Sequence, residues 1–298
     1  MGRYAEPLIH AHQLPALENH VEVFISEARL AHRSSADPGA VEEEQLMTIL
    51  VSFDPLPAQR WAARTLAGTF ITAQSTFQQL PVGHDLTGWL NGLLDNCACA
   101  SLCIVWSLPA IYSEETAHQI EAISEGIRSG RHHLQLAVAV GVRPVDWAHC
   151  ISIDGFIAAS AERVNQTALE VFSLLAALMA PGMYACVDAE DLRMVFGTHE
   201  LPSRVASGVW LQSKNLFILA TDEDQHLVKN SRVLAFMPAR PLRISSLHEL
   251  LQALRKFAAS DSELVMIAPY GLSSEPFLAD QIVPIFLIAA PVAIRTSD

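Results

Sequence analysis

The sequence has little that would direct it across or into a membrane. Its N-terminus lacks the basic start and the apolar block of a signal peptide, and it has no uncharged apolar run of about 18 residues. The best candidate, residues 282–294, is too short and contains Pro284 and Pro291, so it is better interpreted as a buried strand. We therefore expect a cytoplasmic protein without a transmembrane segment.

Positive charge is also scarce. The chain has 19 lysines and arginines and 32 aspartates and glutamates, which gives a formal net charge of −13. Because this balance repels phosphates, it argues against a nucleic-acid groove or an anionic membrane surface. The chain is 51% hydrophobic and 17% charged, so we expect it to be globular rather than disordered.

Cysteine is infrequent and odd in number, since the chain has five, which fits a reducing compartment. Cys97, Cys99 and Cys103 form a C-x-C-x3-C cluster that invites a metal interpretation. Zinc ribbons instead use C-x2-C pairs with a second pair elsewhere, and Cys103 lies in an apolar strand. Buried or loop cysteines are favoured over a metal site, and we expect neither metal nor cofactor.

The common catalytic and phosphate-binding motifs are missing as well. The chain has no P-loop of the form G-x4-G-K-[ST], no G-x-G-x-x-G, no G-x-S-x-G and no H-E-x-x-H. These absences leave no sequence signature for an enzyme.

What is present is an alternation of strands and helices. Residues 17–31 have the pattern of an amphipathic helix, within an extension (residues 1–45) that either docks or forms a mobile tail. Deleting residues 1–40 should then leave a folded core. Beyond the extension we expect strands over 47–53, 69–72, 101–107, 134–142 and 150–153, and helices over 58–67, 84–94 and 114–129. Such repeated β–α units imply a parallel sheet with helices on both faces.

The pattern changes after a long helix over residues 161–179, which Pro181 and Gly182 end. The second half predicts helices over 188–196 and 246–259, with Ser246 and Glu249 as a capping box. Its expected strands are 204–211, 233–237, 263–270 and 281–288. We divide the chain into the extension, a parallel-sheet domain (46–160), a central helix (161–180) and an α+β domain (181–298).

Three segments, in the correct order, resemble the tubulin/FtsZ superfamily. The first is Leu136-Ala-Val-Ala-Val-Gly-Val-Arg-Pro144, and the second runs from Cys186-Val-Asp188-Ala-Glu-Asp191 to Arg204-Val-Ala-Ser-Gly208. The third comprises residues 232–236, 242–250 and 264–271. The resemblance implies an α/β, FtsZ/tubulin-like fold: a Rossmann-like N-terminal domain, a long central helix and a C-terminal α+β domain with a mixed sheet.

In that family a glycine-rich loop, G-G-G-T-G-T/S-G, follows the strand that matches residues 103–107 and cradles the phosphates. Here the position reads Ser107-Leu108-Pro109-Ala110, without glycine and with a proline that supplies no N–H. The first β–α turn, Phe53-Asp54-Pro55-Leu56-Pro57, has no glycine cluster either. The resemblance therefore implies a divergent member that has lost its phosphate loop and its GTPase activity.

The acidic positions of the family's catalytic loop are matched by Asp188 and Asp191, while Cys186 stands where the family has asparagine. In the family this loop acts on the nucleotide of the next subunit, so the resemblance implies a protein interface here. Asp188 and Asp191 also suit the N-terminus of a helix, where they cap it and complement its dipole. The two roles are compatible, and both stay open.

From the resemblance we expect a non-enzymatic pseudo-GTPase that acts through protein–protein contacts. It would be a structural or regulatory partner of a bacterial cytoskeletal or cell-division filament. Two alternatives stay open: a scaffold that self-assembles without nucleotide, and an enzyme or small-molecule sensor with a remodelled cleft at the sheet's carboxyl edge.

Overall fold

A mixed sheet of eleven strands forms the centre of the computed structural model. The structure describes residues 20–33, 41–53, 74–81, 85–96, 99–109, 114–128, 133–140, 152–178, 189–196, 202–211, 214–219, 231–238, 244–257, 265–270 and 282–291. The strands are β1 (His20–Arg33), β2 (Val41–Ser52), β3 (Gln74–Pro81), β4 (Cys99–Ser107), β5 (His133–Val140), β6 (Gly155–Ala159), β7 (Ser203–Leu211), β8 (Leu216–Leu219), β9 (Ser231–Pro238), β10 (Val265–Tyr270) and β11 (Ile282–Pro291). The helices are α2 (Leu86–Asn96), α3 (Glu114–Arg128), α4 (Val164–Leu178), α5 (Ala189–Phe196) and α7 (Ile244–Phe257).

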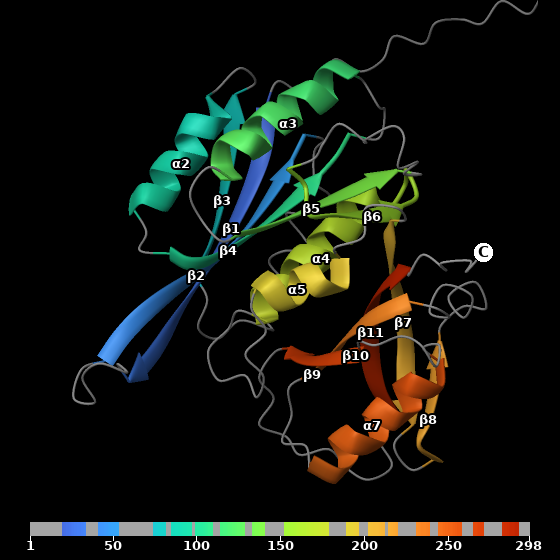
Figure 1. The fold of residues 1–298 in the computed structure, drawn as a ribbon. Helices are drawn as coiled ribbons and strands as arrows, with labels where there is room; N and C mark the ends of the chain where they lie inside the picture. The colour runs from blue at the N-terminus through green and yellow to red at the C-terminus, as the bar shows by residue number, and fades with distance from the viewer. Residues whose placement is uncertain are drawn as a thin grey trace, which may run out of the picture.

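The strands lie in the order β10-β9-β11-β7-β6-β5-β4-β2-β1-β3, and β8 pairs with β7 (Figure 1). From β2 to β7 the neighbours are parallel, as the repeated β–α units predict. Beyond β7 the sheet is mixed, because β11 runs antiparallel to β7 and β9 while β9 and β10 are parallel. The α/β character and the mixed second half are thus confirmed. The parallel sheet predicted for the first half is confirmed only from β2 to β6, because β1 and β3 add antiparallel pairs at its edge.

One strand joins the two halves into a single sheet. The first residues of β7, Ser203 and Arg204, pair with β6, whereas its last four residues pair with β8. The sequence predicted a separate second half, but hydrogen bonding is continuous across β7. The domain boundaries themselves stay a prediction.

Helices cover both faces of the sheet. On one face, α2 and α3 enclose a core cluster that includes Ile104 and Trp106. On the other, α4 and α5 pack on Cys103 and Val105, the alternate residues of β4, and this cluster extends to Leu234, Phe236 and Ile288 of the second half. The central helix therefore contacts both halves, while α7 covers a third cluster that includes Trp210 and Phe217.

The helix predicted over residues 17–31 is wrong, because residues 20–31 lie in strand β1. Val23 and Ile25 are buried on one face of the sheet and Phe24 on the other. Because Val23, Phe24 and Ile25 are apolar on both faces, β1 lacks the strict alternation that identifies a half-buried strand. β1 lies between β2 and β3 and is antiparallel to both, so residues 20–33 are part of the sheet rather than a detachable extension.

Smaller corrections concern the ends of elements. Residues 152–154 form a turn, not a strand, and β6 begins at Gly155. Helix α7 begins at Ile244, so Ser246 lies in its first turn and cannot be the cap of an S-x-x-E box. The helix predicted over 58–67 and the strand over 69–72 lie outside the described residues, and β3 and β8 were not predicted.

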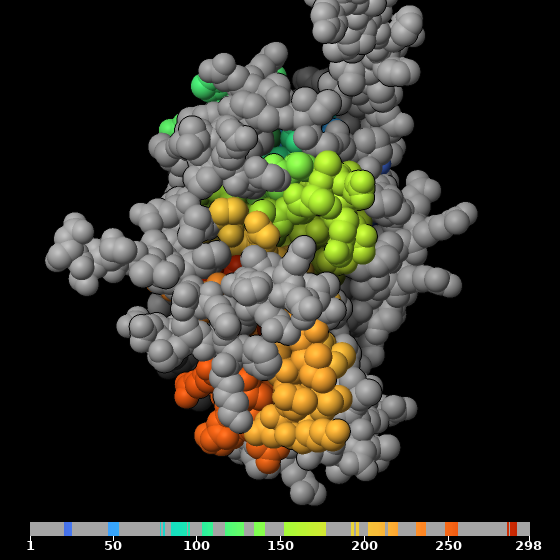
Figure 2. Space-filling view, turned by 90° about the vertical axis from the view of Figure 1, so that its right-hand side faces the viewer, coloured from blue at the N-terminus to red at the C-terminus, as the bar shows by residue number. Residues whose placement is uncertain are grey.

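The edge ribbon of β7 and β8 presents apolar side chains to solvent. Leu216 and Ile218 of β8 are 44% and 43% exposed, and their partners in register are Leu211 and Val209 of β7. Figure 2 shows this ribbon, in orange, at the surface below the segment of α4. Individually exposed aliphatic residues are normal on protein surfaces, so the ribbon receives no functional assignment.

Candidate functional site

The carboxyl ends of the parallel strands are where open α/β sheets usually bind ligands. At this edge β4 ends with Ser107, and the next residue, Leu108, has its side chain fully buried in the cluster under α2 and α3. The backbone N–H of Leu108 donates to the carbonyl of Val138 on β5 at 2.9 Å. Pro109, which is half-buried, has no N–H, and Ala110 lies outside the described residues.

Two of the positions that the sequence resemblance matches to a phosphate loop are therefore committed to the fold. An anion cradle needs successive backbone N–H groups that point outward and residues small enough for close approach. Leu108 gives its N–H to the sheet and its side chain to the core, and Pro109 has no N–H to give. These two residues offer an anion no backbone donor.

A polar contact fixes the same strand end to the central helix. The hydroxyl of Ser107, which is buried, donates to Oδ1 of Asn165 at 2.7 Å. Asn165 is in the first turn of α4, so the bond sets where the central helix begins relative to β4. Beside it, the ring of Phe53 stacks on Trp106 with centroids 6.4 Å apart and an interplanar angle of 14°. Residues 54–57, the first β–α turn, lie outside the described residues.

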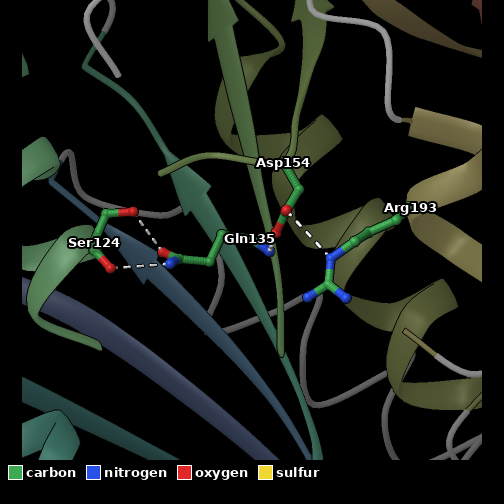
Figure 3. Close-up of polar contacts among 4 residues, drawn as sticks. All are labelled: Ser124, Gln135, Asp154 and Arg193. Atoms are coloured by element: carbon green, nitrogen blue, oxygen red, sulfur yellow. Dashed lines mark hydrogen bonds and ion pairs between the residues drawn. The ribbon is translucent and has the colours of Figure 1, made fainter. Parts of the chain in front are cut away.

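The opposite, amino-terminal edge of the parallel strands holds a buried polar cluster (Figure 3). Gln135 of β5 is completely buried, and its Oε1 accepts from Ser124 Oγ at 2.8 Å and from Trp106 Nε1 at 3.1 Å. Its Nε2 donates to the carbonyl of Ser124 at 3.1 Å. The amide side chain thus ties α3 to strands β4 and β5, with partners for both ends.

The cluster continues from Gln135 to helix α5. The N–H of Gln135 donates to Asp154 Oδ2 at 2.8 Å, and the N–H of Asp154 donates back to the carbonyl of Gln135, also at 2.8 Å. Asp154 Oδ1 accepts from Arg193 Nε at 3.3 Å, in an ion pair whose side chains are 8% and 24% exposed (Figure 3). One carboxylate therefore joins the start of β6, strand β5 and α5.

Helix α5 follows the loop that resembles the family's catalytic loop. Asp191 is the third residue of α5, whereas Cys186 and Asp188 lie outside the described residues, Asp188 directly before the helix. Leu192, Val195 and Phe196 of α5 are buried in the cluster around α4. The structure thus places Asp191 in the first turn of an anchored helix at the sheet's amino-terminal edge, away from Ser107 and Leu108. The capping and interface roles both stay predictions.

Sequence reasoning missed the polar cluster of Gln135, Asp154 and Arg193. Gln135 was visible as a single polar residue inside the apolar strand His133–Val140. A polar side chain in such a strand is buried only if it is hydrogen-bonded, so its position was a usable signal. The rest of the cluster could not be predicted, because Ser124, Asp154 and Arg193 come from other parts of the chain.

No metal-binding group of three or more His, Cys, Asp or Glu residues occurs in the part of the chain that the structure describes. Of the three clustered cysteines, Cys103 is buried in the α4 face of the sheet, Cys99 begins β4, and Cys97 lies outside the described residues. Among the described helices, none combines the length and apolar character needed to cross a bilayer.

Comparison with known proteins finds distant similarities among solved structures. No family model and no curated protein matches the chain. Among solved structures, the chain is similar to the FtsZ W319Y mutant of M. jannaschii, with 13% identity over 70% of each chain and a TM-score of 0.44. A TM-score of this size does not by itself establish a shared fold, so the family assignment stays a prediction from the sequence.

Proposed function

We propose that this chain is a non-enzymatic protein of the tubulin/FtsZ type that has lost nucleotide binding. It acts through protein–protein contacts, as a structural or regulatory partner of a bacterial cytoskeletal or cell-division filament. The family part of the proposal rests on the three ordered sequence segments. The loss of nucleotide rests on the turn after β4.

The arrangement of Leu108 is the observation that carries the loss of nucleotide. A phosphate at this turn would compete with the β5 carbonyl for the Leu108 N–H and would meet a proline next. Breaking the first contact leaves a buried carbonyl unpaired, which costs about 1–3 kcal/mol. Withdrawing the leucine side chain from the core costs about 1.5–3 kcal/mol more.

The two acidic residues, Asp188 and Asp191, support a role for the end of the molecule opposite the turn after β4. Asp191 lies on a helix that the core and the Asp154–Arg193 ion pair hold in place, so a contact made there has a rigid base. A protein with one functional end can add to the end of a filament but offers no nucleotide-loaded surface to the next subunit. Such a protein caps or tunes a filament rather than extending it.

Two measurements test the proposal. Isothermal titration with GTP and with GDP should give no binding heat; micromolar binding to this chain would overturn the loss of nucleotide. Separately, the double variant Asp188→Ala/Asp191→Ala should unfold at nearly the wild-type temperature but no longer co-pellet with filaments. Unchanged co-pelleting would remove the interface role of the loop.

A further inference from the structure

The hairpin of β1 and β2 is longer than the sheet it belongs to. β3 pairs with β1 only as far as Glu27, and β4 pairs with β2 only from Gln45 onward. Among the described strands, Ala28–Arg33 pair only with Val41–Leu46 of β2, and Val41–Glu44 pair only with Leu30–Arg33 of β1. Figure 1 shows this segment projecting from the sheet as a two-stranded ribbon, which we call the arm (residues 28–33 and 41–44).

Such a ribbon is not stable by itself. A two-stranded hairpin without a third strand is at best marginally stable in water. Its outer edges carry rows of backbone N–H and C=O groups that can template another strand. The arm has two such edges, one on β1 and one on β2.

The two edges have opposite charge. The β1 part of the arm contains Arg29, His32 and Arg33 and no acidic residue, whereas the β2 part contains Glu42, Glu43 and Glu44 and no basic residue. Like charges directly opposite each other destabilise a strand pair, and opposite charges stabilise it. Pairing β1 with β1, or β2 with β2, from two copies therefore sets like charges together. Only β1 of one arm against β2 of another brings opposite charges together.

We propose that the arm joins copies of this chain by strand addition, with the basic β1 edge of one arm paired to the acidic β2 edge of the next. This contact is heterologous, since each copy uses two different surfaces, and it leaves one edge open at each end of the assembly. Heterologous contacts build open fibres, or rings where the rotation closes. The inference goes beyond the proposed function and does not depend on it, because it requires neither nucleotide nor a filament of another protein.

A charge-exchanged arm tests the pairing. The variant Arg29→Glu/Arg33→Glu/Glu42→Lys/Glu44→Lys exchanges the charges of the two edges while keeping them complementary. Two Arg→Glu changes lower the net charge by four and two Glu→Lys changes raise it by four, so the total stays at −13. We expect each protein alone to sediment at twice the monomer mass or more at low salt. Each should return toward monomer near 1 M salt, where the Debye length falls to about 3 Å.

The decisive measurement is the mixture of the two proteins, one carrying a fluorescent label. Heterologous pairing predicts that wild type and exchanged variant do not co-sediment, because every mixed β1–β2 contact sets like charges together. Symmetric β1–β1 or β2–β2 pairing predicts the reverse, stronger association in the mixture than in either protein alone, and that result would overturn the proposal.

Two further outcomes count against it. Wild type that stays monomeric at all concentrations would mean that the charges serve to keep the edges unpaired. Association that persists after residues 28–45 are replaced by a short turn would assign it to another surface. Circular dichroism and thermal unfolding of each variant show whether the sheet is intact. Titration with GTP and co-pelleting with a filament should not change in the shortened variant, so failure here is distinct from failure of the proposed function.

Discussion

At the scale of single residues, small side chains and one amide decide how the elements meet. Gln135 satisfies the hydroxyl of Ser124 and the indole N–H of Trp106 inside the core, where an unpaired polar atom costs about 1–3 kcal/mol. Gly155, the first residue of β6, lets α5 approach the sheet. A β-carbon at Gly155 would lie 2.8 Å from Cβ of Phe196 and 3.2 Å from Cδ2 of Leu136.

We expect Gly155→Ala to lower the free energy of unfolding by about 1–3 kcal/mol, because the nearest atom is next to the α5 backbone and cannot rotate away. Urea denaturation measures the change. Gly92→Ala is the matched control, since a β-carbon there meets nothing within 4 Å and alanine suits the interior of α2. The control should be stabilised by about 0.5–1 kcal/mol. Equal effects of the two substitutions would contradict the close packing at Gly155.

At the scale of elements, the regular alternation of the chain made most strands and helices predictable. The parallel strands β4 and β5 and the helices α3, α4 and α5 lie where the apolar pattern placed them, whereas β2 was predicted from residue 47 and begins at Val41. β1 could not be distinguished from a helix, because a strand buried on both faces lacks the polar alternation that identifies one. The Asp154–Arg193 pair was also unpredictable, since its partners are 39 positions apart in the sequence and only the folded sheet brings α5 to the start of β6.

We expect Arg193→Ala to cost about 1–3 kcal/mol, since it removes a charged partner from a largely buried carboxylate. Arg163→Ala is the control. Arg163 and Glu170 form a 4.0 Å pair in which the arginine is 62% exposed, and such surface pairs contribute about 0–1 kcal/mol. A double-mutant cycle with Asp154→Asn should give a coupling of about 0.5–3 kcal/mol. A coupling near zero would show that Arg193 acts only through the packing of its stem.

At the scale of the whole molecule, the continuity of the sheet could not be predicted from the sequence. The change of pattern after the central helix indicated two halves, and the strand directions agree with the prediction except at β1 and β3, which pair antiparallel. What joins them is a pair of backbone contacts, Ile157 with Ser203 and Ala158 with Arg204, plus the core shared by α4 and α5. Backbone pairing between strands about 45 residues apart leaves no local signal in the side chains.

The structure reverses the expectation that residues 1–40 can be removed. Their deletion takes away Val23, Phe24 and Ile25, all buried, and leaves β3 without its neighbour. Each of these side chains contributes about 1.5–3 kcal/mol, so together they approach the total stability of an ordinary domain, about 5–15 kcal/mol. We expect an insoluble product, or one without a cooperative thermal transition. A soluble product that melts like wild type would show that β1 is dispensable.

The divided pairing of β7 bears on how the molecule responds to load. The first two residues of β7 pair with β6 of the parallel half, and its last four residues pair with β8. A force on either half is therefore transmitted along one continuous strand rather than across a hinge. Rotation of the halves against each other would have to break the two β6–β7 residue pairs and disturb the core that α4 and α5 share. We therefore expect the two halves to move as one rigid unit, so that a torque applied at one end of the molecule reaches the other end.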